Sequence, residues 1–237
     1  MNVKDLQKKS EEIRERTINY HRKTQIPHIG CGLGIIEILT TLYYKVMKSG
    51  DNFILSKGHA SAPLYIILNE KGFIPNSELY KLEEHPTLNK EYGIDATTGS
   101  LGHGLSLGAG MALANRQNKV HVLMGDGECD EGQIWEAARI ASYLKLKNLI
   151  AIIDCNGFQG FKKTEGKIGR KFFAFGWEVI ECDGHNCESL IKNLNTKTEK
   201  PLIILARTIK CKGVKKMENK LESHYFKLKK NEEENIK

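Results

Sequence analysis

Short apolar segments alternate with longer amphipathic segments along most of this chain. The apolar segments are six or seven residues long, are rich in Val, Ile and Leu, and include 119–124, 149–154 and 201–207. Strands that are apolar on both faces are typical of a parallel sheet covered by helices on both sides. Because helical patterns separate the strands in sequence, we predict a three-layer α/β/α fold with a mostly parallel sheet.

Two further strands and the connecting helices complete this prediction. Strands are expected at 52–56 and 177–182. A flexible glycine-containing connection is expected at 30–34, and a long irregular segment at 72–98. The spacing of apolar residues predicts helices at 3–23, 35–48, 59–71, 105–116, 130–144 and 187–194.

Length and composition are those of an ordinary globular protein. The chain has 237 residues, of which 40% are hydrophobic and 27% charged, so one domain spanning 1–237 is expected. The net charge of +7 arises mostly near the C-terminus, where residues 207–237 contain 10 Lys and Arg and 5 Glu. We interpret 208–237 as a basic, charged C-terminal extension that is solvated or faces a partner, and expect no nucleic-acid binding.

The sequence shows no signal for secretion or membrane insertion. Residues 1–16 are charged throughout, and the apolar runs are far shorter than the ~20 residues needed to cross a bilayer. The six cysteines form no Cys-x-x-Cys pair, which favours reduced thiols over a disulfide framework or a zinc knuckle. A cytoplasmic location is therefore expected.

Polar residues follow two of the expected strands. Gly125-Asp126-Gly127 comes directly after one strand, and 28 residues separate Gly127 from Asn156, which follows the strand at 149–154. The carboxyl ends of parallel strands form the usual ligand crevice of such a sheet. A carboxylate and an amide oxygen, with phosphate oxygens, suit the octahedral coordination of Mg²⁺. Taken alone Gly-Asp-Gly would be a plain turn, but its spacing from Asn156 favours a metal-diphosphate site.

This spacing resembles the diphosphate-binding motif of thiamine diphosphate enzymes. Further segments resemble transketolases in particular, in the family's order and over nearly the whole chain. The segments are Phe53-Ile54-Leu55-Ser56-Lys57-Gly58-His59-Ala60, His85-Pro86, Thr97-Thr98-Gly99-Ser100-Leu101-Gly102-His103-Gly104, Lys212-Gly213-Val214 and Met217-Glu218-Asn219. The resemblance implies the thiamine diphosphate-binding fold of the diphosphate-binding domain, and ketol transfer.

The resemblance also implies the ligands of the cofactor. Asp126, Asn156 and the main-chain carbonyl of Phe158 are expected to bind the Mg²⁺ or Ca²⁺ that bridges to the diphosphate. The residues expected at thiamine diphosphate itself are His59, Gly99, Ser100, Leu101, Gly127, Glu128, Asn156 and His224. Glu131 matches a glutamate that contacts the activating glutamate of a neighbouring subunit.

Histidines supply the expected acid and base groups. Imidazole titrates near neutral pH, which suits a reaction that moves protons on and off sugar oxygens. The matching positions are His28, His59, His85 and His224. His121 and His185 receive a structural interpretation instead.

A complete transketolase has two further domains, and no segment here resembles them. The missing second domain carries the glutamate that activates the cofactor. The chain is therefore interpreted as the N-terminal subunit of a two-subunit transketolase, expected to form an α2β2 heterotetramer with a separate C-terminal subunit. Its expected substrates are a ketose phosphate donor and an aldose acceptor.

Three alternatives remain open at this point. One is another thiamine diphosphate enzyme subunit, similar to deoxyxylulose phosphate synthase or to the alpha subunit of a 2-oxoacid dehydrogenase. A second is ketol transfer on an unusual sugar or sugar nucleotide, since the family's His-Pro-Gly pattern reads His28-Ile29-Gly30 here. The third is a scaffold that has kept the fold without catalysis.

Overall fold

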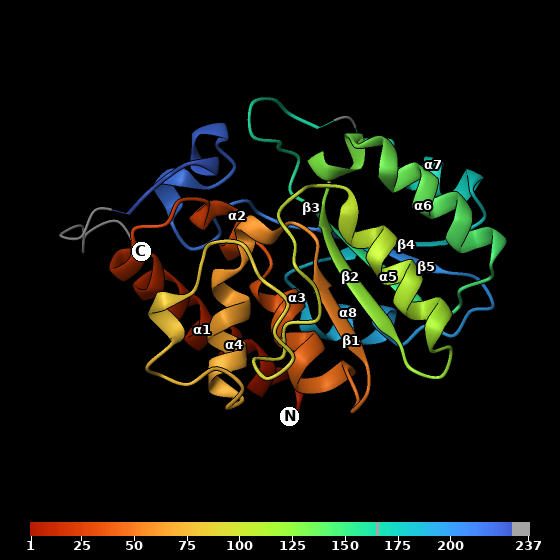
Figure 1. Ribbon diagram of the computed structural model, residues 1–237. Coiled ribbons are helices and arrows are strands. Elements are labelled where there is room, and N and C mark those ends of the chain that lie inside the picture. The colour runs from red at the N-terminus through yellow and green to blue at the C-terminus, as the bar shows by residue number, and fades with distance from the viewer. Residues whose placement is uncertain (165, 229–237) are drawn as a thin grey trace.

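The computed structural model describes residues 1–164 and 166–228 and contains a five-stranded parallel sheet (Figure 1). The strand order is β1-β2-β3-β5-β4, and every neighbouring pair is parallel. The strands are β1 (Asn52–Leu55), β2 (Val120–Gly125), β3 (Leu149–Cys155), β4 (Glu178–Asp183) and β5 (Leu202–Arg207). The predicted strands and their parallel arrangement are confirmed.

Helices cover both faces of this sheet (Figure 1). One face carries α1 (Val3–Thr24), α2 (Ile29–Leu33), α3 (Ile36–Thr41), α4 (Ala62–Glu70) and α8 (Cys187–Leu194). The other carries α5 (His103–Ala114), α6 (Gly132–Tyr143) and α7 (Ile168–Ala174). None of the helices in the described part of the chain is long and apolar enough to span a bilayer.

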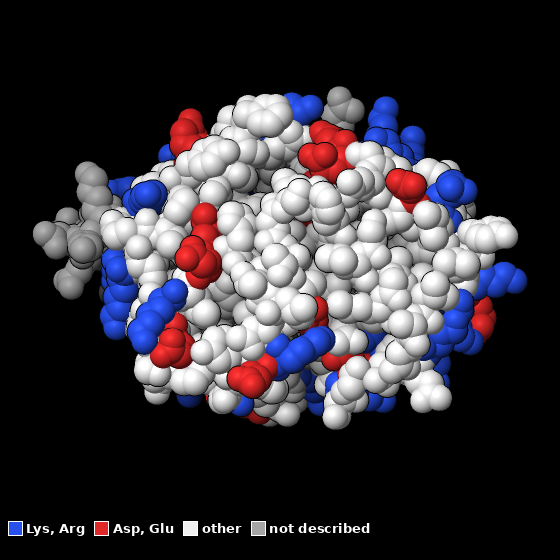
Figure 2. All heavy atoms as spheres, in the orientation of Figure 1, with Lys and Arg blue, Asp and Glu red and all other residues white. Residues whose placement is uncertain are grey.

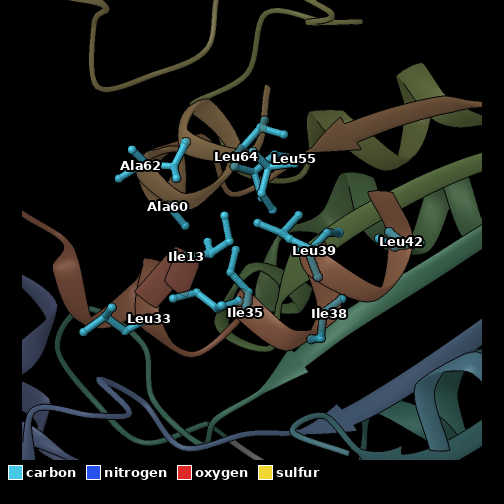
Figure 3. Close-up of a cluster of buried hydrophobic side chains, with 14 of the residues drawn as sticks. Ile13, Leu33, Ile35, Ile38, Leu39, Leu42, Leu55, Ala60, Ala62 and Leu64 are labelled. Atoms are coloured by element: carbon cyan, nitrogen blue, oxygen red, sulfur yellow. The ribbon is translucent and has the colours of Figure 1, made fainter. Parts of the chain in front are cut away.

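The alternating side chains of the strands divide the core in two. Ile150 and Ile152 of β3 pack with the cluster under α1, α3 and α4, whereas Ala151 and Ile153 pack with the cluster under α5 and α6. Figure 3 shows the first cluster, in which Ile13 of α1 lies among side chains from the segments that include α3 and α4. The three-layer prediction is therefore confirmed.

The surface over α5 is poor in charged residues. The helix contains no Asp, Glu, Lys or Arg, and Leu107 and Leu113 are 42% and 46% exposed. Figure 2 shows that this side of the molecule carries few charged side chains.

Two local predictions were wrong. The expected connection at 30–34 contains the buried helix α2, and α7 lies between two expected strands where the sequence predicted no helix. Gly30 serves close packing, because a Cβ atom there would lie 2.6 Å from the main-chain oxygen of Ser223. Glycines that permit such a contact resemble glycines of a flexible loop in sequence, which explains the error.

The basic extension folds back onto the domain as far as it is described. Lys210, Val214, Ser223 and Leu228 are all at most 1% exposed, so 208–228 is not a solvated tail. The sequence predicted an extension that is solvated or faces a partner. The solvated alternative is wrong for these residues, the partner-facing one stays a prediction, and 229–237 lie outside the described residues. The turn of this segment at Leu221–His224 packs against α2 (Figure 1).

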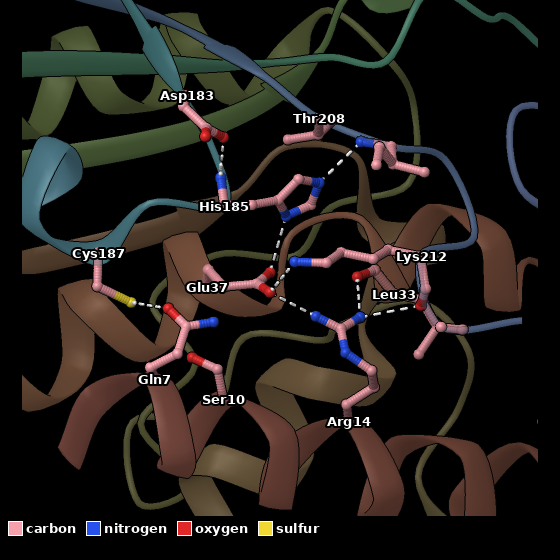
Figure 4. Close-up of polar contacts among 12 residues, drawn as sticks. Gln7, Ser10, Arg14, Leu33, Glu37, Asp183, His185, Cys187, Thr208 and Lys212 are labelled. Atoms are coloured by element: carbon pink, nitrogen blue, oxygen red, sulfur yellow. Dashed lines mark hydrogen bonds and ion pairs between the residues drawn. The ribbon is translucent and has the colours of Figure 1, made fainter. Parts of the chain in front are cut away.

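A buried carboxylate anchors this segment (Figure 4). One oxygen of Glu37, in α3, accepts hydrogen bonds from Arg14 Nη2 and Lys212 Nζ, both at 2.6 Å. The other accepts from His185 Nδ1 at 3.0 Å, and His185 Nε2 accepts from the main-chain N–H of Ile209 at 2.8 Å. Burial opposes ionisation, yet His185 and Arg14 lower the pKa of Glu37 to about 2. His185 therefore has the structural role expected from the sequence.

We expect Glu37→Gln to reduce the free energy of unfolding by about 3 kcal/mol, because it leaves Arg14 and Lys212 without their buried counter-charge. The measurement is urea unfolding followed by circular dichroism. Since the pKa of Glu37 is lowered to about 2 in the folded chain, the difference from wild type should be full above about pH 5 and disappear as the pH falls toward 2.

The control is Glu181→Gln, which breaks an ion pair with Arg207. The Glu181 side chain is 58% exposed and the Arg207 side chain 62% exposed. It should change stability by less than about 1 kcal/mol. Equal effects of the two substitutions would contradict an anchoring role for Glu37.

Candidate active site

A cavity of about 410 Å³ opens beyond the carboxyl ends of β2 and β3. Its walls come from the β2–α6 and β3–α7 connections, the segment before α5, the start of α2 and the C-terminal segment. This is the position at which open parallel sheets bind ligands.

Asp126 and Asn156 lie at the ends of neighbouring strands, as predicted. Asp126 is 4% exposed and accepts hydrogen bonds from the N–H groups of Gly127 at 2.9 Å and Gly157 at 2.6 Å. Asn156 Oδ1 accepts from the N–H of Phe158 at 3.0 Å. The two strand ends and the turn at Gly157 thus bring together the three residues expected to hold a metal.

The surroundings of Asp126 suit a cation. Burial, and then the nearby carboxylate of Asp154, raise the pKa of Asp126 to about 6. A buried carboxylate that faces a second carboxylate is stabilised by a divalent ion, and oxygen ligands are those that Mg²⁺ and Ca²⁺ prefer. These residues therefore fit the metal-diphosphate group predicted from the sequence.

The buried carboxylate of Asp154 joins the ends of neighbouring strands through hydrogen bonds. Its carboxylate accepts from Lys57 Nζ at 2.5 Å, from Asn156 Nδ2 at 2.8 Å and from the Thr208 hydroxyl. Burial opposes ionisation, but the Lys57 charge and these hydrogen bonds lower the pKa of Asp154 below its ordinary value. The hydrogen bond from Nδ2 to Asp154 and the one that Oδ1 accepts from the Phe158 N–H fix the orientation of the Asn156 amide.

Three of the predicted histidines form a cluster. The ring centroids of His28 and His59 are 5.0 Å apart, and His224 lies 5.1 Å and 5.6 Å from them. His28 has a left-handed backbone (φ 65°) at the start of α2, and its Nδ1 donates to Glu84 at 2.6 Å. Residues nearly 200 positions apart in sequence thus face one cavity.

Burial keeps two of these rings neutral. It lowers the pKa of His59 to about 3, and Lys57 adds to this effect. It also lowers the pKa of His28, although the hydrogen bond to Glu84 opposes the shift. Neutral imidazoles can accept a proton or a hydrogen bond at physiological pH.

Glu128 supports the glycine-rich turn before α5. It is 2% exposed and accepts from the Ser56 hydroxyl, from Gly102 N at 2.9 Å and from Gly125 N at 3.1 Å. Burial raises its pKa above the ordinary value, despite these hydrogen bonds. At Gly99, where φ is +145°, a Cβ atom would lie 2.9 Å from the His85 ring, so this turn requires glycine.

Every residue predicted from the sequence for this site lines the cavity, except Ser100. The residues brought together are His28, His59, His85, Gly99, Leu101, Asp126, Gly127, Glu128, Glu131, Asn156, Phe158 and His224. His121 lies elsewhere, fully buried in β2 and outside the residues that line the cavity.

Sequence reasoning missed three charged residues at the site, namely Lys57, Asp154 and Lys210. Asp154 and Lys210 are each at most 1% exposed and Lys57 is 2% exposed, so they are buried charges beside the cavity. Lys57 follows β1, Asp154 lies at the end of β3 and Lys210 follows β5. These positions could have indicated site residues, because polar residues at the carboxyl ends of the strands face the crevice.

Comparison with known proteins agrees with this geometry. Residues 6–237 match the family model described as transketolase, thiamine diphosphate binding domain. The chain therefore belongs to the transketolase family and corresponds to its N-terminal, thiamine diphosphate-binding part.

Similar relatives include two proteins that are themselves named as subunits of transketolases. One is an apulose-4-phosphate transketolase subunit of Phocaeicola vulgatus, 38% identical, with 95% of this chain and 90% of the relative aligned. The other is a 6-deoxy-6-sulfo-D-fructose transketolase subunit of a Clostridium species, also 38% identical, with 94% and 92% aligned.

Solved structures agree with the fold. The crystal structure of transketolase from Campylobacter jejuni superposes with a TM-score of 0.86 at 30% identity. The match covers 94% of this chain but 40% of the bacterial enzyme, so the chain spans less than half of that transketolase. The fold and family predicted from the sequence are confirmed, and the other classes of thiamine diphosphate enzyme are not favoured.

We expect Lys57→Met to lower the free energy of unfolding by about 3 kcal/mol, because it leaves the buried Asp154 carboxylate without its cation. Adding Asp154→Asn should restore part of this loss, giving a coupling energy above about 1 kcal/mol in a double-mutant cycle measured by urea unfolding.

Lys147→Met provides the control, since Lys147 pairs with Glu199 through side chains that are 57% and 87% exposed. Its effect should stay below about 1 kcal/mol. Strictly additive effects of Lys57→Met and Asp154→Asn would contradict the coupling.

Proposed function

We propose that this chain binds thiamine diphosphate and Mg²⁺ in the cavity and, with a separate C-terminal subunit, transfers a two-carbon ketol unit from a ketose to an aldose. The observation that carries the proposal is that one cavity holds both the Asp126–Asn156 pair and the cluster of His28, His59 and His224. Oxygen ligands for a metal and imidazoles for proton transfer are two of the components that the reaction needs.

Each group of residues has a distinct proposed role. Asp126, Asn156 and the Phe158 carbonyl hold Mg²⁺, or Ca²⁺ in its place. Bound thiamine diphosphate supplies the electron sink for carbon–carbon bond cleavage. The residues proposed to lie against it are His59, Gly99, Ser100, Leu101, Gly127, Glu128, Asn156 and His224.

The histidines are proposed to handle the protons of the sugar. His28 and His59 are neutral because burial lowers the pKa of each, so they accept hydrogen bonds or protons from hydroxyl groups. His224 and His85 face the same space and complete the set. The Glu84 carboxylate at 2.6 Å holds the Nδ1 proton of His28, which leaves Nε2 as its acceptor.

The proposed partner carries the activating glutamate. Both relatives described above are named as subunits, which supports a second chain in the complex. Glu131 is exposed and also lines the cavity, so it is accessible to a residue arriving from outside. We propose that Glu131 contacts the partner's glutamate, and that two copies of each chain form an α2β2 heterotetramer.

The uncharged surface over α5 is the proposed contact with the partner. This helix begins beside the cavity, since a Cβ atom at Gly102 would lie 2.9 Å from Glu131 Cβ. The same helix carries the exposed Leu107 and Leu113. The face shown in Figure 2 has few charged side chains. A partner covering these leucines would bury apolar surface while reaching the cofactor.

The proposed donor is a ketose with an anionic end group. The relatives are named for a sugar phosphate and a sulfonated sugar, and Lys57, Lys162 and Lys210 line the cavity here. A cytoplasmic location is proposed as well, and it is supported by six cysteines that are all free thiols.

Asp126→Asn should weaken magnesium-dependent binding of thiamine diphosphate at least about 100-fold, because it removes the only carboxylate proposed to contact the metal. Isothermal titration calorimetry on the full chain measures the affinity, and circular dichroism checks the fold. Asp183→Asn is the matched control, since Asp183 also ends a strand of the sheet but is not among the residues that line the cavity. Unchanged affinity in Asp126→Asn would refute the metal assignment.

The chain alone should show no ketol transfer from a ketose phosphate with thiamine diphosphate and Mg²⁺, whereas a mixture with a C-terminal transketolase subunit should be active. Leu107→Lys should weaken the association of the two chains at least tenfold by placing a charge in the contact. Analytical ultracentrifugation measures association.

Val3→Lys is the control, because Val3 is 40% exposed and begins α1, which packs on the opposite face of the sheet from α5. Full activity of the chain alone would overturn the two-subunit proposal. If Leu107→Lys associates with the C-terminal subunit as tightly as wild type, the proposed contact over α5 is wrong.

A further inference from the structure

Cys31 lies at the cavity beside two basic groups from the C-terminal segment. Its Sγ is 3.6 Å from His224 Nδ1, which also accepts a hydrogen bond from Lys210 Nζ at 3.1 Å. Lys57 Nζ donates to the main-chain oxygen of Cys31 at 3.1 Å. A thiol held between an imidazole and ammonium groups has the environment of a reactive cysteine.

The thiol differs from the other cysteines of the chain. Burial would raise the pKa of Cys31, but the hydrogen bond with His224 and the charge of Lys210 lower it below the ordinary value. Burial instead raises the pKa of Cys182 to about 11 and that of Cys211 to about 12. Two further titratable groups lie near the thiol. Burial keeps the His59 ring neutral, and burial together with Cys31 itself raises the pKa of the Cys211 thiol, so neither adds a charge that competes with Lys210.

The same groups also resemble a metal site. Ligand atoms of Cys31, His59 and His224 all lie within 4.8 Å of one another. However, the Lys210 ammonium occupies the hydrogen-bonding position at His224 Nδ1, and a cation placed there would be repelled by it. The positive charge that disfavours a metal stabilises a thiolate, so the cluster favours nucleophilic chemistry at sulfur.

We propose that Cys31 is a modification site, whose sulfur reacts with peroxides and other small electrophiles that enter the cavity. With hydrogen peroxide, the sulfur attacks one oxygen, an S–O bond forms and the O–O bond breaks. The departing oxygen leaves as water after taking up the thiol proton. The sulfur is oxidised by two electrons to a sulfenic acid, and the peroxide is reduced by two.

Modification would place a bulky or polar group beside His28, His59 and His224. Because these rings line the same cavity, the modified side chain blocks it. This consequence for ketol transfer rests on the proposed function, whereas the reactivity of the thiol does not.

The test is timed alkylation of the full chain with iodoacetamide between pH 6 and 9. Peptide mass spectrometry then compares Cys31 with Cys182. We expect Cys31 to react at least tenfold faster at pH 7, even though Cys31 is 3% and Cys182 9% exposed. The pH at which the labelling rate of Cys31 is half its maximum should lie below about 8.5, the ordinary value for a thiol.

Two variants separate activation from simple access. Lys210→Met and His224→Asn should each slow the labelling of Cys31 at pH 7 at least threefold and move its pH profile upward. Lys162→Met is the control, since Lys162 also lines the cavity but pairs with Asp130 at 3.6 Å. Circular dichroism confirms that each variant is folded.

Labelling of Cys31 that is no faster than that of Cys182, or pH profiles unchanged in both variants, would overturn the proposal. Peroxide treatment followed by dimedone should add the trapping mass to Cys31, and its absence would remove peroxides from the proposal. These measurements need no activity, so an inactive complex with the partner subunit would count against the proposed function alone.

Discussion

The buried carboxylate of Asp154 is the interaction on which the site depends. It lies at the end of β3 and receives hydrogen bonds from Lys57 after β1, Thr208 after β5 and its own neighbour Asn156. Three strand ends are thereby fixed relative to one another by one fully buried group. An unpaired charge at this depth would be strongly unfavourable, so each donor must be in place for the others to hold. The geometry of the proposed metal ligands follows from this requirement.

Much of the fold could be predicted because its physical cause is local in sequence. The strands β2, β3 and β5 are short runs of buried aliphatic residues, and their alternation with helices determines a parallel sheet. The helix α2 was missed because its Gly30 allows close contact with Ser223, a residue that no local pattern connects to it. The packing of 208–228 was missed for a similar reason. Its lysines indicate a solvated segment, yet Lys210 and Lys212 contact His224 and the buried Glu37.

In the candidate site too, the features with a local cause in the sequence could be predicted and those that depend on tertiary packing could not. Asp126 and Asn156 could be predicted to lie together because each directly follows a strand of the sheet. The histidines were found only through the resemblance to transketolases, since His28, His59 and His224 are far apart in sequence and share no periodicity. The environment of Cys31 was beyond any sequence argument. Its character depends on how closely His224 and Lys210 approach, and that approach is determined by tertiary packing.

The folding back of 208–228 has a consequence for the order of events during synthesis. His28 and Arg14 leave the ribosome early, whereas His224, Lys210 and Lys212 are among the last described residues to emerge. The sheet needs β5, and the histidine cluster needs the segment after it, so the cavity closes only when translation of this region is nearly finished. Until then the nascent chain holds an incomplete histidine cluster and an incompletely neutralised Glu37. Cofactor capture therefore has to follow the docking of residues 208–228 onto the sheet and α2.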